Sequence, residues 1–142
     1  MAARPARTQK VAKEFEAAQA QVMRWREGGP ALFAVEALGM PPEYDPKAGK
    51  GVIDWWKPAS EKLVRKKRLS IRSGHGVSKS AYLSICILWF MACYFPCKIP
   101  CTAPTAHQLE DVLWAELAKW HRVLEANCPA LAAQFNWTRD HF

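Results

Sequence analysis

The eight residues from Ser73 to Ser80 constrain the fold of this 142-residue chain more than any other segment. The segment, SGHGVSKS, follows a short β-rich run, Arg68–Arg72, and opens a long apolar stretch with the character of a helix. A phosphate-binding loop needs backbone N–H groups at a helix N-terminus, a lysine for the β and γ phosphates, and a hydroxyl for Mg²⁺. The nucleotide-binding residues predicted from this pattern are Gly74, His75, Gly76, Val77, Ser78, Lys79 and Ser80, with Ser80 also on the metal ion.

The loop departs from the full pattern G-x-x-x-x-G-K-[ST] at two positions. Ser73 and Ser78 stand where that pattern has glycine. A glycine lets the loop backbone curl close to phosphate, so a side chain at Ser78 is expected to strain the loop or crowd the ligand. We therefore expect weakened nucleotide binding.

A second segment downstream has the same strand-to-helix character. Lys98–Thr102 predicts another strand, although Pro100 removes one backbone donor from it. The run T-A-P-T then leads into a long helix, where Thr105 and Gln108 form a T-x-x-Q capping box. Apolar residues recur along that helix at helical spacing, and we expect them to pack on a sheet. They are Leu109, Leu113, Leu117, Trp120 and Leu124.

Together, S-G-H-G-V-x-K-S and T-A-P-T-x-x-Q, spaced as in a βαβ unit, resemble the ATPase domain of phage terminase large subunits. Terminases are the motors that package double-stranded viral DNA. The resemblance covers roughly Arg68 to Leu124. It implies an α/β fold, a partial P-loop NTPase βαβ unit of the additional-strand class preceded by an N-terminal helical segment. The expected organisation is a helical and loop segment over residues 1–60 and the first part of a truncated P-loop ATPase domain over residues 61–142.

The same resemblance implies the ligands and partners. ATP and Mg²⁺ are the expected cofactors, and double-stranded DNA, a small terminase subunit and the capsid portal are the expected partners. Oligomers are expected only within a full-length motor. The residues implied in DNA contact or coupling are Thr102, Thr105, Arg65, Lys66 and Lys67. No apolar strand ending in an acid follows Ser80, and no nuclease cluster is present, so no catalytic residue is identified and hydrolysis by this chain alone is not expected.

Positive charge is concentrated in the first half of the chain. Residues 1–72 hold 15 basic and 8 acidic groups, whereas residues 73–142 hold 5 of each. Six basic residues fall just before the loop: Lys62, Arg65, Lys66, Lys67, Arg68 and Arg72. This cluster fits a polyanion contact and fits equally a solvated helix end and strand edge. The alternative function is a small stand-alone DNA-binding or regulatory module that uses this basic segment.

The N-terminal part has clear helical signals. Gln9–Glu27 predicts a helix, which Gly28, Gly29 and Pro30 end, and Leu32–Leu38 predicts a short second helix. One face of the first helix is apolar and consists of Val11, Phe15, Ala18 and Val22. Trp55 and Trp56 are expected to anchor the following loop to the core.

Residues 80–97 carry no charge, and as one helix they span roughly 27 Å, slightly short of a bilayer core. A helix covered on most sides explains the run better than a membrane span. Cys93, Cys97 and Cys101 are better explained as ordinary thiols than as a metal site. The N-terminus has no apolar signal core, so the expected location is the reducing cytoplasm of a bacterial host cell.

Overall fold

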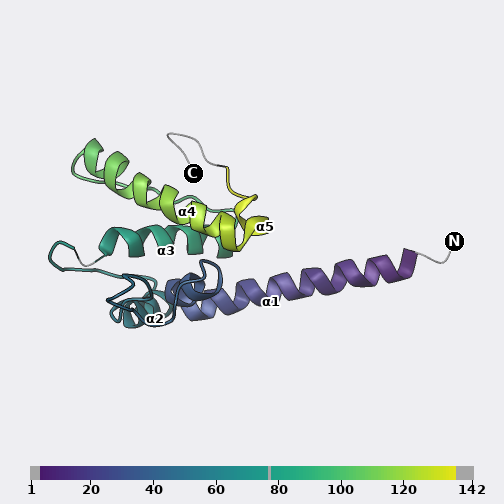
Figure 1. Cartoon of the computed structure of the whole chain (residues 1–142). Helices are drawn as coiled ribbons and strands as arrows, with labels where there is room; N and C mark the ends of the chain where they lie inside the picture. Colours follow the sequence, from purple (N-terminus) through teal and green to yellow (C-terminus); the bar gives the residue numbers. More distant parts are fainter. Residues whose placement is uncertain (1–3, 77, 137–142) are drawn as a thin grey trace.

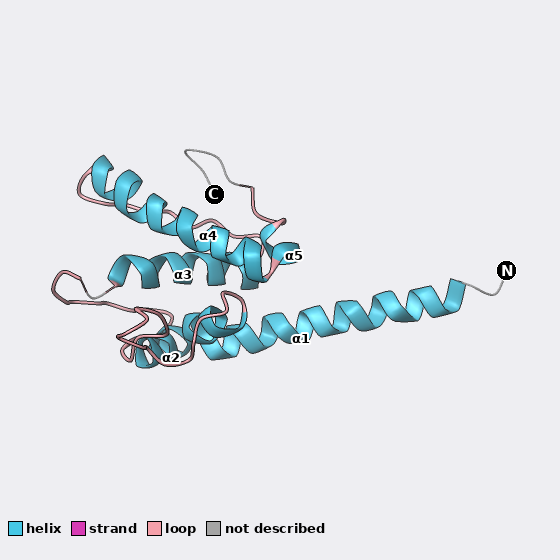
Figure 2. Cartoon of the chain, in the orientation of Figure 1, coloured by secondary structure: helices cyan, strands magenta, loops and turns pink. Residues whose placement is uncertain are grey.

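The computed structural model describes residues 4–76 and 78–136, and this part of the chain is built from helices and loops (Figure 2). The elements in chain order are α1 (Arg4–Glu36), α2 (Trp56–Lys66), α3 (Lys79–Cys93), the π-helix η1 (Gln108–Trp114), α4 (Ala115–Asn127) and α5 (Pro129–Ala132). α3 lies in the middle, with α1 and α2 on one side and η1, α4 and α5 on the other (Figure 1). The first part of α1 extends away from this body.

The expected α/β fold, a partial P-loop βαβ unit, is wrong. The chain is 64% helical with 2% strand and no sheet within the described residues. The expected strand Arg68–Arg72 is a loop in which Ile71 is 40% exposed. A strand needs a neighbouring strand to pair its backbone groups, and the described chain holds only an isolated bridge between Asp45 and Lys50.

The second expected strand, Lys98–Thr102, is also a loop. Pro100 contributes no backbone donor there, and no strand lies beside it among residues 4–76 and 78–136. The expectation that the apolar stripe of the following helix packs on a sheet is wrong for the same reason. Leu113, Leu117 and Leu124 are buried, but the surface that η1 and α4 contact is α3. The sequence from Phe135 to Thr138 also has the character of a strand. Phe135 instead closes a turn, since its N–H donates to the carbonyl of Ala132 at 3.0 Å, and residues 137–142 lie outside the described residues.

α1 is two helices joined at a kink, as the Gly28-Gly29-Pro30 signal predicts. Gly29 has φ 77° and ψ −170°, outside the helical region, and Pro30 supplies no N–H at the break. A Cβ at Gly29 would lie 3.0 Å from Val64 Cγ2 and 3.2 Å from Ser60 Cβ of α2. Glycine is therefore required at this position both by its backbone conformation and by the close approach of α2.

The apolar core forms where the second part of α1 packs on α3. Phe33, Ile85, Leu88 and Leu117 are fully buried, and Trp25 and Phe33 meet edge to face with ring centroids 5.1 Å apart. Trp56 is 1% exposed and its ring lies 5.6 Å from that of Tyr82, which confirms the predicted anchor. α3 is covered on both sides, so its apolar composition reflects burial. Across residues 4–76 and 78–136, no helix has both the length and the hydropathy needed to cross a bilayer.

A buried polar chain joins α1, α2 and α3. Pro30 and the kink leave the N–H of Ala31 without an intrahelical acceptor, and it donates instead to Ser60 Oγ of α2 at 3.0 Å. The same oxygen lies 3.1 Å from the hydroxyl of Tyr82 in α3. Ser60 and Tyr82 are each 1% exposed, and burial raises the pKa of Tyr82 well above its usual range. One serine hydroxyl therefore ties three helices together.

Two further contacts tie α1 to α3. The Trp89 indole N–H donates to the carbonyl of Trp25 at 2.7 Å, and Arg26 Nε donates to the carbonyl of Cys93 at 2.7 Å. The Arg26 guanidinium also lies 4.7 Å from the ring centroid of Tyr94. The last two turns of α3 are thereby held beside Trp25 and Arg26, directly before the kink of α1.

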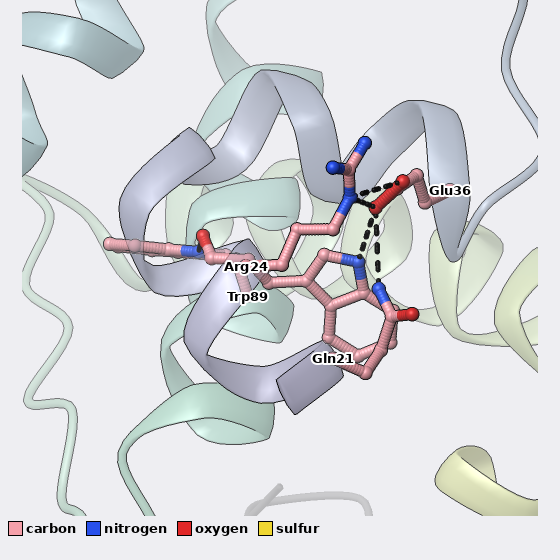
Figure 3. A network of polar contacts seen from close by, with 5 residues as sticks. Gln21, Arg24, Glu36 and Trp89 are labelled. Carbon is pink, nitrogen blue, oxygen red and sulfur yellow. Dashed lines mark hydrogen bonds and ion pairs between the residues drawn. The ribbon is translucent and has the colours of Figure 1, made fainter. Parts of the chain in front are cut away.

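The kink of α1 is braced by Glu36 (Figure 3). Its carboxylate accepts from Arg24 Nε at 2.8 and 2.9 Å, from the Trp25 indole at 3.2 Å and from the Gln21 amide at 3.3 Å. The hydrogen bond from Arg24 lowers the pKa of Glu36. These contacts span the break and fix the angle between the two parts of α1.

Ser60→Ala is expected to destabilise the protein by about 1–3 kcal/mol, because it leaves the Ala31 N–H and the Tyr82 hydroxyl buried without their partner. Tyr82→Phe removes only one end of the chain and should cost about 1 kcal/mol. Both substitutions remove the hydrogen bond between Ser60 and Tyr82, so the double variant should lose less free energy of unfolding than the sum of the two single variants. Urea unfolding followed by circular dichroism measures all three. The exposed Ser70→Ala is the control, and a Ser60→Ala stability equal to that of this control would contradict the assignment.

Candidate functional site

The candidate site is the loop that connects α2 to α3. α2 ends at Lys66, and Lys67 adopts a left-handed conformation with φ 58° while its N–H donates to the carbonyl of Leu63 at 2.9 Å. This is the usual geometry of a helix C-cap. From there the chain runs as an exposed loop through Gly76, with Leu69 partly buried against the core. Residues 74–76 of the predicted nucleotide-binding segment are therefore solvent-accessible.

The end of the loop turns sharply into α3. Gly76 has φ 76°, and Ser78 has φ 60° and ψ 32°, so both lie in the left-handed region. Ser78 caps α3, and its carbonyl accepts the first helical hydrogen bond, from the N–H of Tyr82 at 3.0 Å. Lys79 and Ser80 are the first two residues of the helix. Val77, between Gly76 and Ser78, lies outside the described residues.

Lys79 folds back over the loop. Its Nζ donates to the carbonyl oxygen of Ser73 at 2.8 Å, so the ammonium group links the two ends of the glycine-containing segment. A Cβ built at Gly74 or at Gly76 meets no heavy atom within 4 Å. His75, at the tip, is exposed. The loop is therefore open on its outer side and has a cation at its base.

The structure places the Ser80 hydroxyl at the start of α3, partly exposed, while the Ser80 carbonyl accepts from Ser84 Oγ at 2.8 Å. A hydroxyl in this position fits one ligand of a Mg²⁺ ion that is otherwise held by phosphate oxygens and water. Within the described ranges no group of three or more His, Cys, Asp or Glu residues is arranged to hold a metal.

The basic cluster lies directly before the loop. Its six members, Lys62, Arg65, Lys66, Lys67, Arg68 and Arg72, are all exposed. No carboxylate of residues 4–76 or 78–136 lies within ion-pair distance of any of them, as the ion pairs of this part of the chain involve other residues. The last turn of α2 and the loop therefore form one electropositive surface.

Thr102 and Thr105 are exposed and lie in the loop before η1. Thr105 Oγ1 accepts from the N–H of Gln108 at 3.3 Å, as one half of the predicted capping box requires. The loop before α3 and the start of η1 lie at the same end of the molecule (Figure 1). No hydrogen bond joins Thr102 or Thr105 to residues 73–76 or 78–80, so the structure does not assemble them into one site.

Three cysteines lie at the end of α3 and in the segment after it: Cys93, Cys97 and Cys101. Cys93 is 1% exposed, and burial raises its pKa to about 12. Cys97 and Cys101 are partly exposed in the segment after α3, and burial raises the pKa of each. A thiol with a raised pKa is a poor nucleophile at neutral pH.

Sequence reasoning missed the carbonyl of Ser73, which holds Lys79. A backbone oxygen carries no residue-type signal, so nothing in the sequence marks it. Comparison with known proteins adds no further assignment, because no protein-family model matches the chain and no curated protein or solved structure is significantly similar to it.

Ser78→Gly is expected to stabilise the protein by about 1 kcal/mol, because a left-handed conformation costs a non-glycine residue roughly that much. Thermal unfolding followed by circular dichroism tests it. Ser70→Gly is the matched control, since Ser70 lies in the same loop without a positive φ, and glycine there should give no gain. An equal response of the two variants would show that Ser78 is not strained.

Proposed function

We propose that this chain is the ATP-binding portion of a phage terminase large subunit, the motor that packages double-stranded viral DNA. The proposal rests on the residues of the loop and not on a βαβ unit, which residues 4–76 and 78–136 do not form. The observation that carries it is the Lys79 ammonium group, which donates to the Ser73 carbonyl at 2.8 Å at the base of the loop. The loop contains two glycines with open space around them and leads into the N-terminus of α3.

The proposed roles follow from charge and position. A neutral carbonyl is a weaker partner for an ammonium group than a phosphate oxygen, so a polyphosphate would displace the Lys79–Ser73 hydrogen bond. The free N–H groups of the first turn of α3 favour an anion at the same place. When bound with ATP, Mg²⁺ would neutralise phosphate charge, and Ser80 is its proposed protein ligand. Gly74, His75 and Gly76 would line the phosphates, while no residue is proposed to activate water.

The partners in this proposal are double-stranded DNA, a small terminase subunit and the capsid portal, in the cytoplasm of a bacterial host cell. Thr102 and Thr105 are the proposed residues for DNA contact or coupling. Both residues are exposed, as a contact with DNA requires.

Nucleotide binding is tested with a fluorescent ATP analogue and Mg²⁺, titrated against the intact chain. We expect weak, saturable binding without phosphate release. Lys79→Ala should weaken it at least about tenfold, the effect of removing one charge-assisted hydrogen bond of ~1.4 kcal/mol. The exposed Lys13→Ala is the control and should bind as the unaltered chain does. Equal affinities for Lys79→Ala and Lys13→Ala would refute the proposed site.

The exposed basic cluster favours a second candidate function, direct binding of duplex DNA. Neutralising three of its members with Arg65→Gln, Lys66→Gln and Lys67→Asn should reduce the salt slope of DNA affinity by about 0.9 for each phosphate that the protein no longer neutralises. Asparagine is chosen at residue 67 because it tolerates the left-handed conformation. Filter binding at several salt concentrations measures the slope, with Lys10→Gln plus Lys13→Gln as control. A slope unchanged by the triple substitution would eliminate this candidate.

A further inference from the structure

Ser70 lies within the basic cluster, in the loop between α2 and α3. Its side chain is exposed, as are those of Arg68 and Arg72, two residues to either side. Ser70 is the only serine or threonine of the sequence with basic residues both two and three positions before it, which are Arg68 and Lys67. The cluster thus surrounds one hydroxyl group with positive charge.

No secondary structure protects the segment around Ser70. Residues 68–72 belong to no helix or strand, and their backbone makes no hydrogen bond with residues 4–76 or 78–136. In the same part of the chain, the Ser70 hydroxyl has no hydrogen-bond partner. Another protein can therefore bind this segment without breaking a helix or a strand.

The other serines differ from Ser70 in exposure or in sequence context. Ser60 has Lys57 three positions before it, but it is 1% exposed and belongs to the buried polar chain. Ser73 is exposed, but Ser70 and Ile71 stand three and two positions before it. Among the serines and threonines of the described residues, exposure and the two preceding basic residues therefore coincide at Ser70.

Serine kinases select their substrates in part by charge. A kinase that prefers basic sequences binds the residues before its target serine through acidic side chains in its own cleft, and the hydrogen bonds are strengthened by charge. Lys67 and Arg68 are available for such contacts, because no carboxylate of the described residues lies within ion-pair distance of either. The loop therefore presents both an acceptor hydroxyl and the charges that direct a kinase to it.

We propose that Ser70 is a phosphorylation site for a serine kinase that selects basic residues before its target. The Ser70 hydroxyl oxygen attacks the γ-phosphorus of the ATP bound to the kinase and loses its proton to the catalytic base of the kinase. The bond from that phosphorus to the β-phosphate oxygen breaks, and the products are phosphoserine and ADP. The ATP is the substrate of the kinase, so this step does not require nucleotide binding by the candidate loop.

The phosphate would change the charge of the cluster. It brings about −1.5 to −2 charges and three acceptor oxygens at neutral pH. Arg68 and Arg72 would pair with this group in place of an external polyanion. This consequence rests on the proposed binding of duplex DNA, which phosphorylation would weaken because fewer cations remain to neutralise DNA phosphates.

The intact chain is incubated with the catalytic subunit of cAMP-dependent protein kinase, Mg²⁺ and ATP, and modified residues are located by mass spectrometry. We expect phosphate at Ser70 and none after Ser70→Ala. Arg68→Gln should lower kcat/KM at least about tenfold, the loss expected for one charge-assisted hydrogen bond. Lys13→Gln removes an exposed charge outside the cluster and should be modified as the unaltered chain is. No phosphate at Ser70, equal modification of Ser73, or equal kcat/KM for Arg68→Gln and Lys13→Gln would overturn the proposal.

The effect on DNA is measured separately, by filter binding of duplex DNA to the phosphorylated chain at several salt concentrations. The salt slope of the affinity should fall by about 0.9 for each DNA phosphate that the protein no longer neutralises. Kinase-treated Ser70→Ala is the control and should keep the slope of the untreated chain. An unchanged slope with Ser70 fully phosphorylated would refute the charge effect. If the untreated chain binds no DNA, the proposed DNA function fails, and mass spectrometry still decides the phosphorylation site.

Discussion

The arrangement of the first three helices depends on one backbone N–H group that has no acceptor within its own helix. Gly29 and Pro30 break α1 and leave the N–H of Ala31 inside the body without an intrahelical acceptor. A buried donor without a partner costs about 1–3 kcal/mol, so the donor requires an acceptor from another element. Ser60 supplies it and reaches Tyr82 at the same time. The break in one helix thereby sets the positions of two others.

This constraint also places the candidate site. Tyr82 lies one turn inside α3 from Ser78, and the carbonyl of Ser78 accepts the N–H of Tyr82. The first turn of α3 is therefore positioned by the buried hydrogen bond between Tyr82 and Ser60. In contrast, a Cβ at Gly74 or Gly76 would meet open space, and Lys79 donates to the Ser73 carbonyl, which a phosphate oxygen could replace. A rigid helix start beside an open loop is the arrangement that anion binding at a helix N-terminus requires.

Local signals in the sequence were enough to predict the helices. The strand predictions were wrong, because a strand depends on pairing with a segment far away in the sequence. The Gly-Gly-Pro break, the Thr105 cap and the apolar face at Val11 and Phe15 act within a few residues, so a single chain reveals them. Whether Arg68–Arg72 is a strand depends on a partner elsewhere, which the described chain does not provide. Likewise, the sequence predicted the residue types of the loop, but the Ser73 carbonyl that holds Lys79 became apparent only in three dimensions.

The first part of α1 and the loop before α3 extend in opposite directions from the body (Figure 1). The basic cluster lies at the end of α2 and in the loop, and Lys79 begins α3, so positive charge flanks the loop on both sides. A polyanion bound at the loop would therefore meet both sets of charges at once, and the affinity of the loop for it would depend on the cluster as well as on Lys79.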